Sequence, residues 1–160
     1  KQRGAGSADT DRLYAAMLAS TTQLNSIGAE LGAVAGVHAM TDVTGFGLLG
    51  HLLEMCRGAG LSAQIDFAAL PLLAGVEALA RAGVRTGAST RNWDSYGGGV
   101  QGVDGWRRDL LCDPQTSGGL LIAVAPDCAG AVVDRARSAG FAEAAIIGGM
   151  VEGGAEITVR

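Results

Sequence analysis

One segment of the sequence, Thr41–His51 (TDVTGFGLLGH), brings together residue types that could handle a phosphate group. Asp42 follows a strand-like run, and Thr44, Gly45 and Gly47 lie where a helix is predicted to begin. Backbone N–H groups in such a turn attract anions, and the helix dipole adds to the attraction. A carboxylate there can hold Mg²⁺ against phosphate oxygens, which is the arrangement of metal-assisted phosphoryl transfer. The alternative is that Asp42 only caps the helix.

A second segment, Leu110–Leu121 (LLCDPQTSGGLL), has a similar composition. Asp113 precedes a proline, which restricts the backbone and predicts a turn. Hydroxyls and unhindered backbone follow, a composition that can cradle an anion or simply form a tight connection into the next strand. The residues that we consider for phosphate binding here are Thr116, Ser117, Gly118 and Gly119.

The two segments need a framework of strands and helices to bring them together. Apolar spacing, glycines and prolines predict an α+β fold, a mixed β-sheet with helices packed on it. We expect residues 1–8 to be a linker or disordered end and residues 9–160 to form one domain. The predicted elements are helices over 11–31, 48–57, 71–82 and 126–139, strands over 36–40, 61–67, 120–125, 144–150 and 156–159, and a long loop over 86–105.

Composition excludes several classes of function. The chain has 160 residues, 48% of them hydrophobic, and a formal net charge of −4, with no basic patch for a nucleic acid. No apolar run is long enough to span a membrane. Lys1 is the only lysine, so a P-loop or Schiff-base chemistry has no residue to use. The three cysteines lack zinc or disulfide spacing, which favours a reducing cytoplasm.

Two single residues invite a chemical interpretation that we do not favour. His51 is a lone histidine on a predicted helix, with no companion ligand at zinc spacing, so we expect a core or surface role. Cys112 stands beside Asp113, whose negative charge would raise the pKa of the thiol, and no lysine is near in sequence. We therefore do not expect Cys112 to be a nucleophile.

The segments TDVTGFGLLGH and DPQTSGGLL closely resemble signatures of the C-terminal half of selenophosphate synthetases. A third stretch, Gly87–Gly97 (GASTRNWDSYG), is similar to another segment of that family. In it Arg91 could pair with a phosphate or a carboxylate, while Trp93 and Tyr96 are expected to pack beneath the loop. The resemblance covers most of the chain and is specific at these three places.

The resemblance implies the fold of an aminoimidazole ribonucleotide synthetase C-terminal domain. It implies an enzyme that uses ATP, selenide and water to make selenophosphate, AMP and phosphate, with Asp42 as a ligand of Mg²⁺ at the ATP site. The reactive cysteine or selenocysteine and its lysine would lie in an N-terminal domain, which would also form a cytoplasmic homodimer. Since the chain begins at Lys1 without methionine, we expect a fragment that lacks this domain and is inactive alone.

Two alternatives stay open from the sequence. One is the C-terminal domain of another ATP-dependent synthetase or kinase of the same superfamily, although such members are not expected to carry both signatures. The other is a non-catalytic interaction domain, which would have no need of a TDVTGFG turn.

Overall fold

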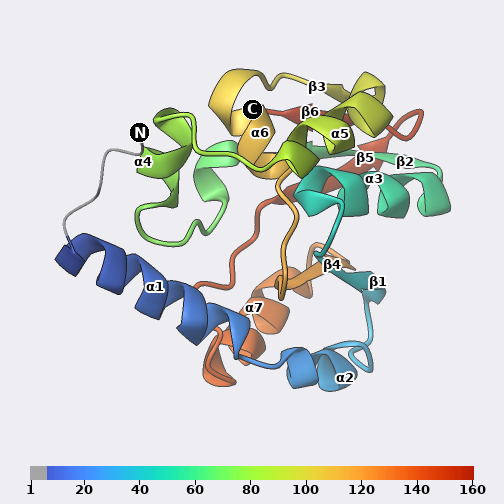
Figure 1. Ribbon diagram of the computed structural model, residues 1–160. Coiled ribbons are helices and arrows are strands. Elements are labelled where there is room, and N and C mark those ends of the chain that lie inside the picture. Colours follow the sequence, from blue (N-terminus) through green and yellow to red (C-terminus); the bar gives the residue numbers. More distant parts are fainter. Residues whose placement is uncertain (1–6) are drawn as a thin grey trace.

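The computed structural model describes residues 7–160, arranged as a four-stranded mixed sheet and a separate two-stranded ribbon, each covered by helices. Figure 1 shows the sheet in the upper half of the molecule and the ribbon below it. The helices are α1 (Ser7–Thr21), η1 (Asn25–Ile27), α2 (Gly28–Leu31), α3 (Gly47–Ala59), η2 (Phe67–Ala69), α4 (Val76–Arg81), α5 (Gly87–Tyr96), η3 (Gly97–Gly99), α6 (Gly105–Leu111) and α7 (Ala129–Ser138). The strands are β1 (Val37–Asp42), β2 (Leu61–Ile65), β3 (Val100–Gln101), β4 (Leu120–Val124), β5 (Gly148–Glu152) and β6 (Ile157–Val159).

The large sheet has the strand order β3-β6-β2-β5, with parallel pairing at β3–β6 and β6–β2 and antiparallel pairing at β2–β5. The last two strands of the chain therefore lie on either side of β2 and are not hydrogen-bonded to each other. In register, Ala63 of β2 faces Ile157 on one side and Met150 on the other. The expected mixed sheet with packed helices is confirmed.

Helix α3 supplies much of the core beneath this sheet. Its residues Leu49, Leu53 and Cys56 are all at most 1% exposed, and they belong to one apolar cluster with Ile157. The helix ends at Gly60, whose φ of +66° is the left-handed conformation typical of a helix C-terminus. The position of this helix matters because its N-terminus faces the first glycine-rich segment.

The β1–β4 ribbon joins the two glycine-rich segments to the rest of the fold. Its strands are antiparallel, with Asp42 opposite Leu120 and Thr41 opposite Leu121. A second, smaller core beneath it joins η1, α2 and α7 through Ile27, Leu31, Val132 and Ala136. The carboxyl end of β1 and the amino end of β4 thus meet at one end of the ribbon.

Several predicted elements differ in the structure. The long loop expected over 86–105 is mostly helical, since α5, η3 and β3 occupy it. The helix expected over 11–31 breaks after α1 and resumes as η1 and α2, and helix α4 begins at Val76 rather than near Pro71. Residues 1–6 of the predicted linker lie outside the described residues, and Ser7 and Ala8 already belong to α1.

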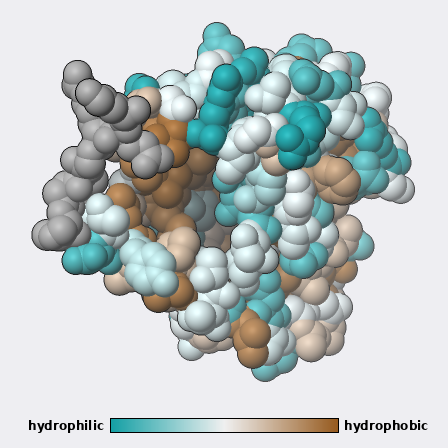
Figure 2. Space-filling model, in the orientation of Figure 1, coloured by the Kyte–Doolittle hydropathy of each residue, from teal (hydrophilic) through white to brown (hydrophobic). Residues whose placement is uncertain are grey.

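Helix α1 lies along one edge of the molecule (Figure 1). A cavity of about 380 Å³ separates it from α4, with Leu13 and Ala16 on one wall and Ala78 and Leu79 on the other. Figure 2 shows hydrophobic residues gathered around this hollow. Among residues 7–160, no helix combines the length and apolarity that crossing a bilayer requires.

Candidate functional site

The two glycine-rich segments lie against each other. We call residues 43–47, between β1 and α3, loop 1, and residues 112–119, between α6 and β4, loop 2. The N–H of Val43 donates to the carbonyl oxygen of Gly119 at 3.0 Å, and the N–H of Gln115 donates to that of Thr44 at 3.0 Å. Loop 1 and loop 2 therefore form one continuous backbone surface, which a single ligand could contact.

Two glycines permit this close approach. A Cβ atom on Gly118 would lie 1.8 Å from the carbonyl oxygen of Val43. Gly47 has a φ of +66°, and a Cβ atom there would lie 2.7 Å from the carbonyl carbon of Cys112. These glycines were predicted to expose backbone to a ligand, and the structure shows that they also let the loops pack.

Two other glycines of the loops face open space. No atom lies within 4 Å of the position that a Cβ would take on Gly45 or on Gly119, and both residues are exposed. Thr116 is exposed as well, while Ser117 is half-buried. The unhindered backbone of the two loops is therefore at Gly45 and Gly119, where an anion could approach.

Asp42 ends strand β1 next to this surface. Its side chain is exposed, and no side chain caps α3, whose N-cap residue is Phe46. The alternative that Asp42 caps this helix is therefore wrong. Within residues 7–160, no group of three or more His, Cys, Asp or Glu side chains could hold a metal ion. The single free carboxylate suits Mg²⁺, which typically takes one or two protein carboxylates together with substrate phosphates.

His51 supports loop 1 from helix α3. Its Nε2 accepts a hydrogen bond from the N–H of Thr44 at 3.0 Å and lies 3.2 Å from the Thr44 hydroxyl. This histidine of α3 therefore holds loop 1 through the N–H group of Thr44, a contact that the sequence did not predict.

The third segment resembling the family forms helix α5, which lies against both loops. The side-chain Nδ2 of Asn92 donates to the carbonyl oxygen of Gly45 at 3.0 Å and to that of Cys112 at 2.9 Å. The Tyr96 hydroxyl donates to the carbonyl oxygen of Phe46 at 2.6 Å. Trp93 and Tyr96 pack against the core as expected. Arg91 is exposed and forms no ion pair with any residue in the described part of the chain.

Sequence reasoning did not identify the role of Asp113. Its Oδ1 accepts hydrogen bonds from the Thr86 hydroxyl at 3.0 Å and the Ser89 hydroxyl at 3.1 Å. Thr86 also caps α5 by accepting from the N–H of Ser89. Threonine is a favoured N-cap residue, so Thr86 could have indicated the start of α5, but no local signal indicates its pairing with Asp113.

Cys112 is fully buried beneath the loops. Burial raises the pKa of its thiol, against the weaker opposing effects of Tyr96 and Arg108. A thiol of this kind is a poor nucleophile, because the reactive species is the thiolate.

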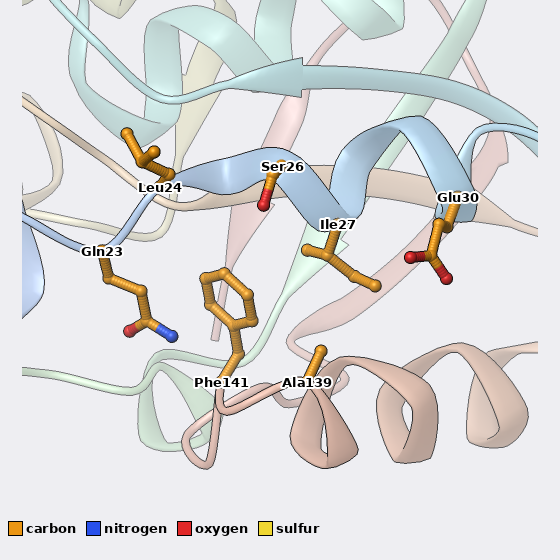
Figure 3. Close-up of a pocket in the computed structure, with 7 residues that line it drawn as sticks. All are labelled: Gln23, Leu24, Ser26, Ile27, Glu30, Ala139 and Phe141. Carbon is orange, nitrogen blue, oxygen red and sulfur yellow. The ribbon is translucent and has the colours of Figure 1, made fainter.

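A pocket away from the loops shows no comparable chemistry. Figure 3 shows it between η1, α2 and the end of α7, with Ile27 and Phe141 pointing into it. Its volume is about 260 Å³, and its one carboxylate, Glu30, pairs with Arg135 at 2.6 Å on the surface. None of the residues predicted for phosphate or metal binding lines this pocket.

Comparison with known proteins gives consistent matches. Residues 4–160 match the family described as AIR synthase related protein, C-terminal domain. Proteins named selenide, water dikinase are 56% identical over 149 residues in Burkholderia ambifaria (strain MC40-6) and 57% in Burkholderia pseudomallei (strain K96243), covering 91% of this chain. One from Pseudomonas straminea is 53% identical over 152 residues, covering 93%. The chain spans 42% of the length of the first two and 43% of the third.

Solved structures support the fold. The HypE–HypF complex superposes with a TM-score of 0.63 at 17% identity, covering 88% of this chain and 39% of that one. HypE of E. coli, a hydrogenase maturation protein, superposes with a TM-score of 0.54 at 22% identity, covering 82% of this chain and 34% of that one. At this level of identity the likeness concerns the architecture alone.

Proposed function

Because the chain belongs to the family of AIR synthase related protein C-terminal domains, we propose that it is the C-terminal domain of a selenide, water dikinase. The proposed reaction transfers one phosphoryl group of ATP to selenide and the other to water, and yields selenophosphate, AMP and phosphate. The identity of more than 50% to proteins of that name supports the assignment. Those relatives are more than twice as long as the chain, so most of the proposed enzyme would lie outside it.

The observation that carries the proposal is the free carboxylate of Asp42 next to the open backbone of loop 1 and loop 2. Magnesium, when bound, would neutralise phosphate charge and orient the transferred group. Asp42 would hold the ion, while backbone groups at Gly45 and Gly119 would contact phosphate oxygens. Thr116, Ser117 and Gly118 are further contacts that we propose on loop 2, and Thr44 and Gly47 shape loop 1.

The rest of the chemistry would come from the N-terminal domain of the complete enzyme. The buried Cys112 is unsuited to attack, and Lys1 is the only lysine. We therefore propose that the nucleophilic cysteine or selenocysteine and its lysine belong to that domain, and that this chain alone does not turn over ATP. The proposed homodimer and cytoplasmic location rest on the family resemblance.

The test is AMP formation from ATP by the complete enzyme, dependent on selenide and magnesium, for wild type and Asp42→Asn. The substitution keeps the shape of the side chain and removes the charge that Mg²⁺ needs. We expect turnover to fall at least about 100-fold, since a lost metal contact removes several kcal/mol of charge stabilisation. Asp134→Asn is the matched control, because Asp134 is exposed on α7. Unchanged turnover in Asp42→Asn would refute the assignment of Asp42.

A further inference from the structure

Helix α5 presents a polar face to the loops. Ser89, Asn92 and Tyr96 are spaced by three and four residues, which places them on one side of a helix. Ser89 bonds to Asp113 of loop 2, Tyr96 bonds to Phe46 of loop 1, and Asn92 bonds to both loops. Hydrogen-bonding side chains thus occupy the inward face, where an ordinary surface helix would carry apolar ones.

We propose that Asn92 is a positioning residue that locks loop 1 to loop 2, so that both present their backbone to the phosphates as one rigid surface. The effect on catalysis rests on the proposed function. The hydrogen bonds that join the two loops are seen in the structure and do not depend on it. Asn92 does not lie among the proposed ligands of metal or phosphate and would act only through the two loops.

The chemistry of an amide suits this task. A side-chain amide nitrogen has two N–H groups, so one Nδ2 atom can serve two carbonyl oxygens. The bonds from Asn92 to Gly45 and Cys112 are 3.0 Å and 2.9 Å long, which is ordinary for strong N–H···O bonds. Aspartate has the same shape but no N–H donors, so the variant Asn92→Asp would place a negative charge next to two carbonyl oxygens and repel them.

The lock acts where the other contacts between the loops do not. The pair Val43–Gly119 joins the loops where they leave the β1–β4 ribbon, and the pair Gln115–Thr44 joins the middle of loop 2 to the residue before Gly45. Asn92 instead holds Gly45, whose backbone faces open space and is exposed. Without Asn92, the carbonyl oxygen of Gly45 loses its side-chain tie to loop 2, and only the backbone bond from Gln115 to Thr44 holds the loops together at this point.

Helix α5 is itself firmly held against loop 2. The buried Ser89 and the cap residue Thr86 both donate to Asp113, so the first turn of α5 is anchored before the helix reaches loop 1. A helix fixed at one loop can therefore restrain the other. Backbone groups held in place before the ligand arrives bind charge without the cost of reorganisation.

The experiment compares wild type, Asn92→Ala and Asn92→Asp in the complete enzyme. Peptide-resolved hydrogen exchange reports on residues 43–47 and 112–119, and steady-state kinetics give KM for Mg-ATP and kcat separately. Loss of two hydrogen bonds predicts exchange about 10-fold faster in both loops and a KM raised about 10-fold, with a smaller change in kcat. Asn92→Asp is expected to be at least as impaired as Asn92→Ala.

Two control variants separate positioning from general stability. Gln23→Ala removes one amide bond, to the carbonyl oxygen of Gly140 at 3.1 Å, which involves neither loop, and should leave KM unchanged. Tyr96→Phe removes the hydroxyl that binds Phe46 of loop 1 and lies beside the Cys112 thiol of loop 2, but it keeps both bonds of Asn92, so it should change exchange less than Asn92→Ala does. If Asn92→Ala does not fold, Asn92→Asp alone carries the comparison.

The outcomes are distinct. Faster exchange in both loops together with a raised KM supports the proposal. If hydrogen exchange in Asn92→Ala is unchanged, or faster in one loop only, Asn92 does not lock the loops together. If exchange is faster in both loops but KM for Mg-ATP is unchanged, the lock has no role in binding. If wild type makes no AMP from ATP and selenide, the proposed function fails, while exchange in the two loops still decides whether Asn92 locks them.

Discussion

Replacing Gly118 by alanine would place a methyl group inside the space of the Val43 carbonyl oxygen. The Cβ atom would lie 1.8 Å from that oxygen and 2.9 Å from the carbonyl carbon, whereas real Cβ atoms essentially never come within 3.0 Å of another heavy atom. Both obstacles are backbone atoms at the end of strand β1, so no flexible side chain can move aside. Loop 1 and loop 2 would have to separate.

The cost follows from what the separation breaks. Forcing an extra methyl into a packed site typically costs about 1–3 kcal/mol. Losing the adjacent bond from Val43 to Gly119 costs about 1 kcal/mol more. Alanine also lowers the conformational entropy of the unfolded chain, which stabilises the folded state by about 0.4–1 kcal/mol. We therefore expect the free energy of unfolding to fall by roughly 1–3.6 kcal/mol, which lowers Tm by about 2–14 °C in a chain of this length.

The assay is urea unfolding of the 160-residue chain, with thermal melting as a second measurement. Gly119→Ala is the matched control, because no atom lies within 4 Å of its added Cβ. We expect this control to remain within about 0.5 kcal/mol of wild type, as is usual for surface substitutions. If Gly118→Ala and Gly119→Ala unfold at the same urea concentration, the close packing of the loops through Gly118 is refuted.

Two further predictions concern ionisable groups. Partial burial raises the pKa of Asp109, but hydrogen bonds and charge from Arg108 and Arg85 outweigh it and hold that pKa below its ordinary 3.8. The Asp109 carboxylate therefore stabilises the fold above its ordinary pKa, and this stabilisation is lost as pH falls through the lowered pKa of the folded state. Urea unfolding of wild type and Asp109→Asn should give equal stabilities only below about pH 4. Burial also raises the pKa of Cys112, and we expect iodoacetamide to modify the half-buried Cys128 of the native chain well before Cys112. Mass spectrometry of the labelled peptides checks this order, and early labelling of Cys112 would contradict its burial.

The sequence by itself determined the local features of this protein. Apolar periodicity predicted helix α3 and strand β2 to within about two residues, and residue types marked loop 1 and loop 2 as similar in chemistry. The position of Asp42 at the end of a strand could also be predicted, because strand and turn signals depend on neighbouring residues. The same local reasoning missed α5, because residues 86–105 contain six glycines and show little apolar periodicity.

Only the tertiary structure decided how these features combine. Asn92 bonds to Gly45, which is 47 positions away in the sequence, and to Cys112, which is 20 positions away. Such pairs depend on how distant elements pack. Local pattern likewise does not show that β2 lies between β5 and β6, or that Gly118 meets Val43. The choice between a cap and a free carboxylate at Asp42 was settled by the backbone around Phe46, which begins helix α3 without a side-chain cap. These contacts join residues that are far apart in the sequence and meet only when the elements that carry them pack together, so no local pattern encodes them.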